Sequence, residues 1–177
     1  MLDFESITYL KEGTQQQQLA YQELMDLKIM DVLKYYHPIL VGTIPIHIDL
    51  PISDLDIICT CKNYFVFTET IKEHYQTQKD FKIKISDDGE SIVANFQGKH
   101  FEIEIFGQMK PTKEQNAYRH LLIEHRILEY YGEDFRQKII RLKKEGMKTE
   151  PAFAQILQLS GNPYQALLNI NLNELLI

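Results

Sequence analysis

Apolar side chains recur along this chain at two different periods, and the period predicts the type of each element. Alternation of apolar and polar residues over 53–61, 81–85 and 101–106, and less regularly over 91–96, predicts strands with one buried face. A short apolar run at 39–42 predicts a further buried strand. Helical spacing predicts helices over the following ranges: 14–28, 29–36, 64–75, 112–132, 134–145, 149–159 and 163–170.

Turn and cap residues divide these elements into an α/β part and a helical part. Thr112 and Gln115, three positions apart, match a capping box at the start of the first C-terminal helix, and Gly132 matches its end. We expect an α/β core over residues 1–110 and a C-terminal helical subdomain over residues 111–177, packed together as one globular unit. The sheet is expected to be short and mixed, with flanking helices.

Two acidic residues in the strand at 53–61 are the first candidates for chemistry. Asp54 and Asp56 lie two positions apart, so their side chains project from the same face, while Leu55, Ile57 and Cys59 point to the other. Neighbouring carboxylates repel each other and stay ionised only where a cation neutralises them. Mg²⁺ suits this role because it binds one or two carboxylates together with the phosphates of its substrate.

A small-residue turn precedes these acids by a fixed spacing. Val41-Gly42-Thr43 is followed by a ten-residue connector and then by Asp54-Leu55-Asp56-Ile57. This pattern resembles the signature of the polymerase-beta-like nucleotidyltransferase superfamily. Over nearly its whole length the chain resembles the DUF4269 proteins, a bacterial family within that superfamily. The likeness rests on five stretches: 42–45, 53–59, 104–108, 115–120 and 148–154.

The resemblance implies a nucleotidyltransferase-like fold and a set of site residues. Asp54, Asp56 and Glu104 would be metal ligands and catalytic carboxylates for Mg²⁺ or Mn²⁺, with Glu102 as the alternative third acid and an exposed strand glutamate as the plain interpretation of either. The implied nucleotide-binding residues are Gly42, Thr43, Ser53, His120 and Lys148. Thr43 departs from the usual serine or glycine; its hydroxyl can contact a phosphate oxygen, whereas its methyl group crowds the turn.

Plainer interpretations remain open for two of these residues. His120 is equally explained as a packing or surface histidine. Lys148 belongs to a run of basic residues that a solvated helix face explains without any function. Cys59 and Cys61 are two positions apart, which is neither the redox spacing nor a zinc ligand set, so we expect buried thiols.

Composition limits the classes of partner. The chain has 177 residues, 44% of them hydrophobic, and a net charge of −6. Nucleic-acid binding relies on clustered Lys and Arg, so the acidic balance favours a small substrate over a polynucleotide. No run of about 18 apolar residues and no signal-peptide pattern occurs, so neither a membrane span nor secretion is predicted, and a cytoplasmic protein is expected.

Together these features predict a metal-dependent nucleotidyltransferase. It would move a nucleoside monophosphate from an NTP to a hydroxyl of a small molecule or a protein. The alternative is a non-catalytic protein of the same fold that acts in nucleotide sensing or partner binding, including a toxin–antitoxin type. The pattern predicts neither the acceptor, nor the preferred base, nor the oligomeric state.

Overall fold

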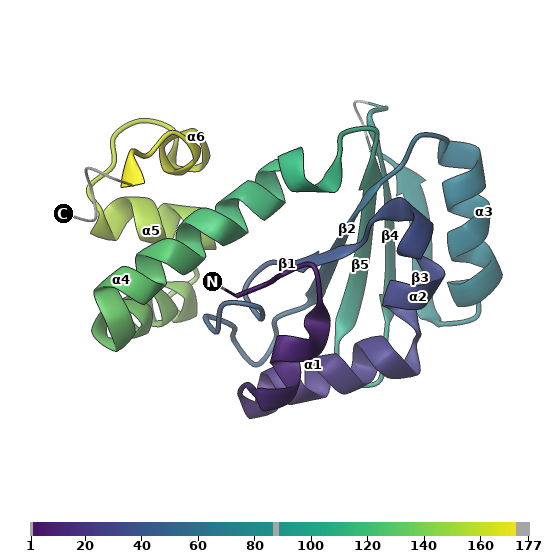
Figure 1. The fold of residues 1–177 in the computed structure, drawn as a ribbon, viewed down its shortest axis with the longest axis horizontal. Coiled ribbons are helices and arrows are strands. Elements are labelled where there is room, and N and C mark those ends of the chain that lie inside the picture. The colour runs from purple at the N-terminus through teal and green to yellow at the C-terminus, as the bar shows by residue number, and fades with distance from the viewer. Residues whose placement is uncertain (1, 87–88, 173–177) are drawn as a thin grey trace.

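A computed structural model describes residues 2–86 and 89–172 and shows one mixed sheet with helices packed around it (Figure 1). The strands are β1 (Ile39–Val41), β2 (Leu55–Thr60), β3 (Lys79–Ile85), β4 (Ser91–Gln97) and β5 (Glu102–Gln108). The helices are α1 (Gln15–Asp26), α2 (Ile29–Val32), α3 (Tyr64–Tyr75), α4 (Asn116–Lys144), α5 (Thr149–Ile156) and α6 (Pro163–Leu168). Short 3₁₀ helices cover Ile7–Glu12, Lys34–Tyr36 and Thr112–Glu114.

The sheet has the strand order β1-β2-β5-β4-β3. Strands β2 and β5 pair in parallel, and the other neighbours pair antiparallel. The parallel pair is central and is connected through α3 and the β3–β4 hairpin, because parallel neighbours need a long crossover. The predicted mixed sheet with flanking helices is confirmed. The expected subdomain boundary at residue 110 falls between β5 and α4 and stays a prediction.

Each face of the sheet belongs to a different hydrophobic core. Leu55, Ile57 and Cys59 of β2 are fully buried in a core shared with α1, α2 and α3, as their alternation predicts. On the opposite face, Ile58 joins a second core formed with β1 and the three C-terminal helices. Both cysteines are free and buried, which confirms that prediction. The polar side chains of β2 therefore lie on the face that turns toward α4.

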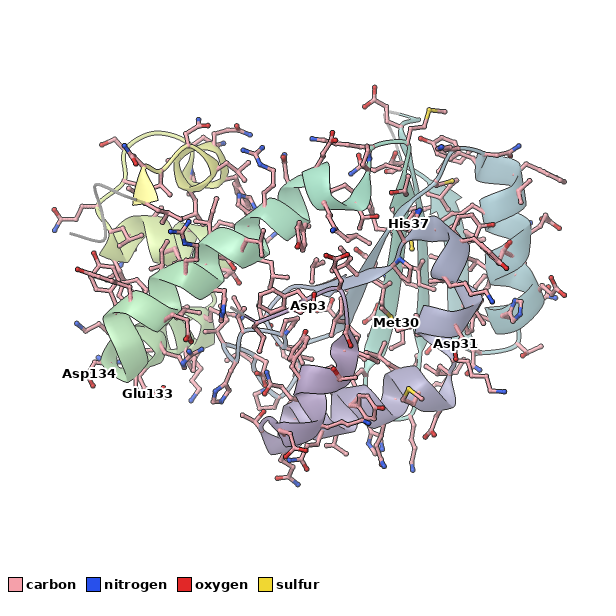
Figure 2. The ribbon with its side chains drawn as sticks, in the orientation of Figure 1. Asp3, Met30, Asp31, His37, Glu133 and Asp134 are labelled. Atoms are coloured by element: carbon pink, nitrogen blue, oxygen red, sulfur yellow. The ribbon has the colours of Figure 1, made fainter. Side chains whose placement is uncertain are left out.

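Helix α4 is interrupted by a bend at Gly132, where the sequence predicts that one helix ends before the next begins. Gly132 takes φ 72° and ψ −161°, a backbone conformation that a side chain disfavours, and helical geometry resumes after it. Glu133 and Asp134 directly follow the bend, which lies on the side of the molecule away from the sheet (Figure 2). The bend turns the second half of α4 back, so that Phe135 and Ile139 pack in the second core.

The predicted capping box at Thr112 and Gln115 is wrong. Helix α4 begins at Asn116, and the Thr112 hydroxyl instead donates to the carbonyl of His37 over 2.8 Å. Gln115 Nε2 donates to the carbonyls of Cys59 and Lys110, each over 3.0 Å. The Thr112 hydroxyl and the Gln115 amide nitrogen donate to carbonyls outside α4, so they do not form the local cap. In contrast, Thr14 caps α1 in a capping box with Gln17.

The predicted helix at 29–36 is also shorter than expected. Helix α2 ends at Val32, and a 3₁₀ turn follows over Lys34–Tyr36. His37 ends this turn with φ 51°, directly before Pro38, which cannot continue a helix. None of the helices in the described part of the chain is long and apolar enough to cross a membrane.

Candidate functional site

The turn after β1 brings the backbone against the acidic strand. Gly42 has φ 79°, and a Cβ atom at this position would lie 2.4 Å from Oδ2 of Asp56. Both the backbone conformation and the close approach therefore require glycine here. The space that a side chain would fill holds the Asp56 carboxylate, so the turn and the acid form one unit.

The loop after this turn is fixed at several points. Thr43 and Ser53 join its two ends through their hydroxyls, 3.2 Å apart, and Ser53 Oγ also accepts from the Leu50 amide over 2.9 Å. Gln17 donates to the carbonyl of Ile44 over 2.9 Å, and Lys143 donates to that of Ile48 over 2.7 Å. Helices α1 and α4 thus hold the loop from two sides.

The parallel strands align two carboxylates side by side. Asp56 of β2 lies in register with Glu104 of β5, so both side chains point to the same face. Asn95 of β4 donates from Nδ2 to Glu104 Oε2 over 3.1 Å, which orients that carboxylate. Glu102, the alternative third acid, is exposed and pairs with Gln97 near the start of β5. The structure therefore brings Glu104, and not Glu102, next to Asp56.

Burial and like charges act together on Asp56. Burial, together with the negative charges of Asp54 and Glu104, raises the pKa of Asp56 to about 7. Asp54 is exposed at the position before β2, close enough for its charge to act on Asp56. The charges of Asp54 and Glu104 thus act on Asp56. A bound cation would favour the ionised form of Asp56.

A cavity of about 530 Å³ opens above these acids. One wall comes from the sheet and contains Gly42, Thr43, Asp56 and Glu104. The other comes from the N-terminal parts of α4 and α5. Its polar residues include Gln115, His120, Glu124 and Glu150. We call these the sheet wall and the helical wall. A cavity of this size can enclose a small ligand.

On the helical wall, His120 is tightly held. Its Nδ1 lies 3.4 Å from Glu150 Oε1, and its Nε2 lies 3.0 Å from the Tyr164 carbonyl. Both ring nitrogens therefore face acceptors. Burial raises the pKa of Glu150, but its hydrogen bond to His120 and other interactions lower this pKa below its ordinary value. His120 therefore joins α4 to α5 and α6 as well as lining the cavity.

The structure does not bring every predicted residue to the cavity. Gly42, Thr43, Asp56, Glu104 and His120 line it. Asp54, Ser53 and Lys148 do not line it. The charge of Asp54 acts on Asp56, and Ser53 forms a hydrogen bond within the loop. Lys148 is exposed at the start of α5. Sequence reasoning assigned no role to Glu124 or Glu150. Their signals were weak: Glu124 lies one helical turn after His120, and Glu150 lies within the 148–154 stretch of family likeness.

The donor set fits a hard divalent cation that is also bound by a ligand. Within residues 2–86 and 89–172, no three His, Cys, Asp or Glu side chains gather closely enough to hold a metal ion. The neighbouring pair of Asp56 and Glu104 offers only oxygen donors, and its uncompensated charge favours a cation. Mg²⁺ is bound in many sites through one or two carboxylates plus substrate phosphates, which is the pattern that this pair allows.

The chain belongs to the DUF4269 family. Residues 22–170 match the model described as "Domain of unknown function (DUF4269)", which covers most of the chain. A comparison with curated proteins finds no match. Membership confirms the resemblance seen in the sequence, but the family's description assigns no activity.

Solved structures show the class of fold. The chain is similar to the GLD-2/RNP-8 complex, with a TM-score of 0.56 and 14% identity over 88% of this chain and 63% of that one. It is similar to the Cid1 poly(U) polymerase bound to MgGTP, with a TM-score of 0.60 and 11% identity over 85% and 53%. It is also similar to a cytoplasmic RNA terminal U-transferase, with a TM-score of 0.54 and 11% identity over 88% of this chain and 46% of that one.

These similarities establish a nucleotidyltransferase-like fold for the chain. The chain spans 46% to 63% of the length of the three proteins. At such low identity, fold is what the comparison shows, because one fold supports many functions.

Proposed function

We propose that this protein transfers a nucleoside monophosphate from an NTP to a hydroxyl group, with Mg²⁺ or Mn²⁺ as cofactor. The observation that supports this most is the alignment of Asp56 with Glu104 on parallel strands, directly against the Gly42–Thr43 turn and facing a cavity. The similar Cid1 structure contains MgGTP, as its name states, and gives the same class of ligand.

Each part of the site has a role in the proposed reaction. Asp56 and Glu104 would hold the divalent ion, with Asp54, at the position before β2, as the proposed further ligand. The ion would bind the triphosphate and stabilise the charge that develops during transfer. Backbone N–H groups of the Gly42–Thr43 turn would face the phosphates, since no side chain of Gly42 is in the way. Ser53 would keep the Thr43 hydroxyl in place through their contact of 3.2 Å. His120 and Lys148 are the proposed nucleotide contacts from the helical side.

The reaction exchanges one phosphorus–oxygen bond for another. The acceptor oxygen bonds to the α-phosphorus, and the bond from that phosphorus to the bridging oxygen breaks. Pyrophosphate leaves with the electron pair of the broken bond. The acceptor's proton would pass to a carboxylate. Glu104 is the candidate if it acts as the general base instead of as a metal ligand, because Asn95 occupies only one of its oxygens.

The acceptor is proposed to be a small molecule or a protein. One of the similar proteins is named as an RNA terminal U-transferase. However, this chain has a net charge of −6, and its cavity wall is acidic, so a polyanionic acceptor would be repelled.

One observation favours a second function. Because the described residues hold no group of three metal-binding side chains in close contact, a protein that senses nucleotides or binds a partner without catalysis is also consistent with the fold. The two proposals differ in whether nucleotide binding depends on the metal and on the carboxylates.

Calorimetric titration with the four NTPs, with and without Mg²⁺ or Mn²⁺, tests the proposal. The wild-type protein should bind at least one NTP in the presence of metal, and Asp54→Asn/Asp56→Asn should lose that binding. Asp31→Asn is the matched control, because Asp31 is exposed on α2, away from the cavity (Figure 2). Absence of NTP binding by folded wild-type protein would contradict the proposal. Metal-independent binding would favour the sensing function.

A further inference from the structure

The helical wall carries acidic groups that the metal–nucleotide site does not use. Glu124 of α4 and Glu150 of α5 line the same cavity as Asp56 and Glu104 but belong to the opposite wall. Glu150 is partnered by His120, at 3.4 Å.

Glu124 is buried, with an exposed fraction of 4%. Within the described residues, its carboxyl makes no hydrogen bond and no ion pair. Burial raises the pKa of Glu124 well above its ordinary value; Glu150 adds to the rise, and Lys143 opposes it. Lys143 acts on Glu124 through its charge, while its ammonium group donates a hydrogen bond to the carbonyl of Ile48. A carboxyl buried without a partner is costly unless a ligand supplies one.

A second unsatisfied acceptor lies on the same wall. Gln115 is 1% exposed, and its Nε2 donates to the carbonyls of Cys59 and Lys110. These two acceptors fix the orientation of the amide, since only its nitrogen can donate to them. Its Oε1 has no hydrogen-bond partner in the described structure. This oxygen is itself buried, so Gln115 belongs to the frame of the wall. Glu124 lines the cavity, and its carboxyl favours a ligand that donates hydrogen bonds.

We propose that Glu124 binds an ammonium group of the acceptor, so that the acceptor is a small amino alcohol. An ammonium group offers three donors and a positive charge, which suits a buried carboxyl and an acidic wall. A phosphate or carboxylate in the same place would face Glu124 and Glu150 and would be repelled. The inference rests on the proposed nucleotidyl transfer, since it names the acceptor of that reaction.

Matched pairs of small molecules test this subsite. Glucosamine is compared with glucose, and diaminopropanol with glycerol, by calorimetric titration in the presence and absence of the best-binding NTP and Mg²⁺. The wild-type protein should bind the amine of at least one pair about tenfold more tightly than its uncharged partner, as one net charge-assisted hydrogen bond allows. Glu124→Gln should lose this preference and keep NTP binding. Glu145→Gln, an exposed change just after α4, should retain both.

A shorter carboxylate provides a check on folding. Glu124→Asp keeps the charge and should keep a reduced amine preference, which a merely structural role for Glu124 would not produce. Equal binding of amine and uncharged partner, no detectable binding of either amine, or an unchanged preference in Glu124→Gln would each overturn the proposal. An amine preference that depends on Glu124, in protein that binds no NTP, would support the subsite and contradict nucleotidyl transfer alone.

Discussion

The two walls of the cavity hold acidic residues in different ways. On the sheet wall, hydrogen-bond register between β2 and β5 places Asp56 beside Glu104, and Asn95 orients the second carboxylate. On the helical wall, Glu124 and Glu150 come from separate helices and meet only because α4 and α5 pack around the second core. The sheet wall concentrates repelling charges in a rigid frame, which suits a metal ion. The helical wall leaves one buried acid without a partner, which suits a ligand.

The largest expected effect separates two glutamates of one strand. Glu104→Gln should weaken metal-dependent NTP binding by about 100-fold, because Glu104 lies in register with Asp56. Glu102→Gln should change it little, because Glu102 is exposed and lies outside the cavity. Calorimetry on both variants checks this pair. Equal losses in the two variants would contradict the assignment of Glu104.

A smaller effect concerns stability without metal. Asp56→Asn should raise the free energy of unfolding at pH 8 by about 2–4 kcal/mol, since it removes a charge that burial and two acids disfavour. The pKa of Asp56 in the folded protein, about 7, lies above its ordinary value of 3.8, so the folded state binds the additional proton. This group's contribution to stability is therefore greatest below pH 3.8 and is lost as pH rises to about 7.

Urea denaturation in the presence of a chelator measures this difference. Asp31→Asn, which is exposed, should leave the free energy of unfolding unchanged. A destabilised Asp56→Asn would show that the carboxylate is satisfied without a cation, and it would remove the electrostatic basis for a metal on the sheet wall.

The sheet wall could be predicted from sequence because a strand has a period of two. Asp56 and Glu104 each sit in an alternating run, and the runs fix which side of the sheet they face. The choice of Glu104 instead of Glu102 followed from the family resemblance. The register of β2 with β5 then placed Glu104 beside Asp56. Local patterns were sufficient here, since the backbone itself determines side-chain direction.

The helical wall could not be predicted in the same way. Which face of α4 meets the cavity depends on its kink at Gly132 and on packing against α5, neither of which the helical period defines. Gln115 illustrates this point. Its spacing from Thr112 favours a capping box, yet tertiary contacts with the Cys59 and Lys110 carbonyls decide its position. Lys148 and Ser53 were predicted from stretches of family likeness, and neither lines the cavity.

Anomalous diffraction from crystals grown with Mn²⁺ and a non-hydrolysable NTP analogue would test the central claim most directly. We predict an anomalous peak with carboxylate oxygens of Asp56 and Glu104 at roughly 2.2 Å and with phosphate oxygens of the analogue completing the coordination. A bound analogue with no peak at these residues, or a peak held instead by Glu124 and Glu150, would contradict the account of the two walls.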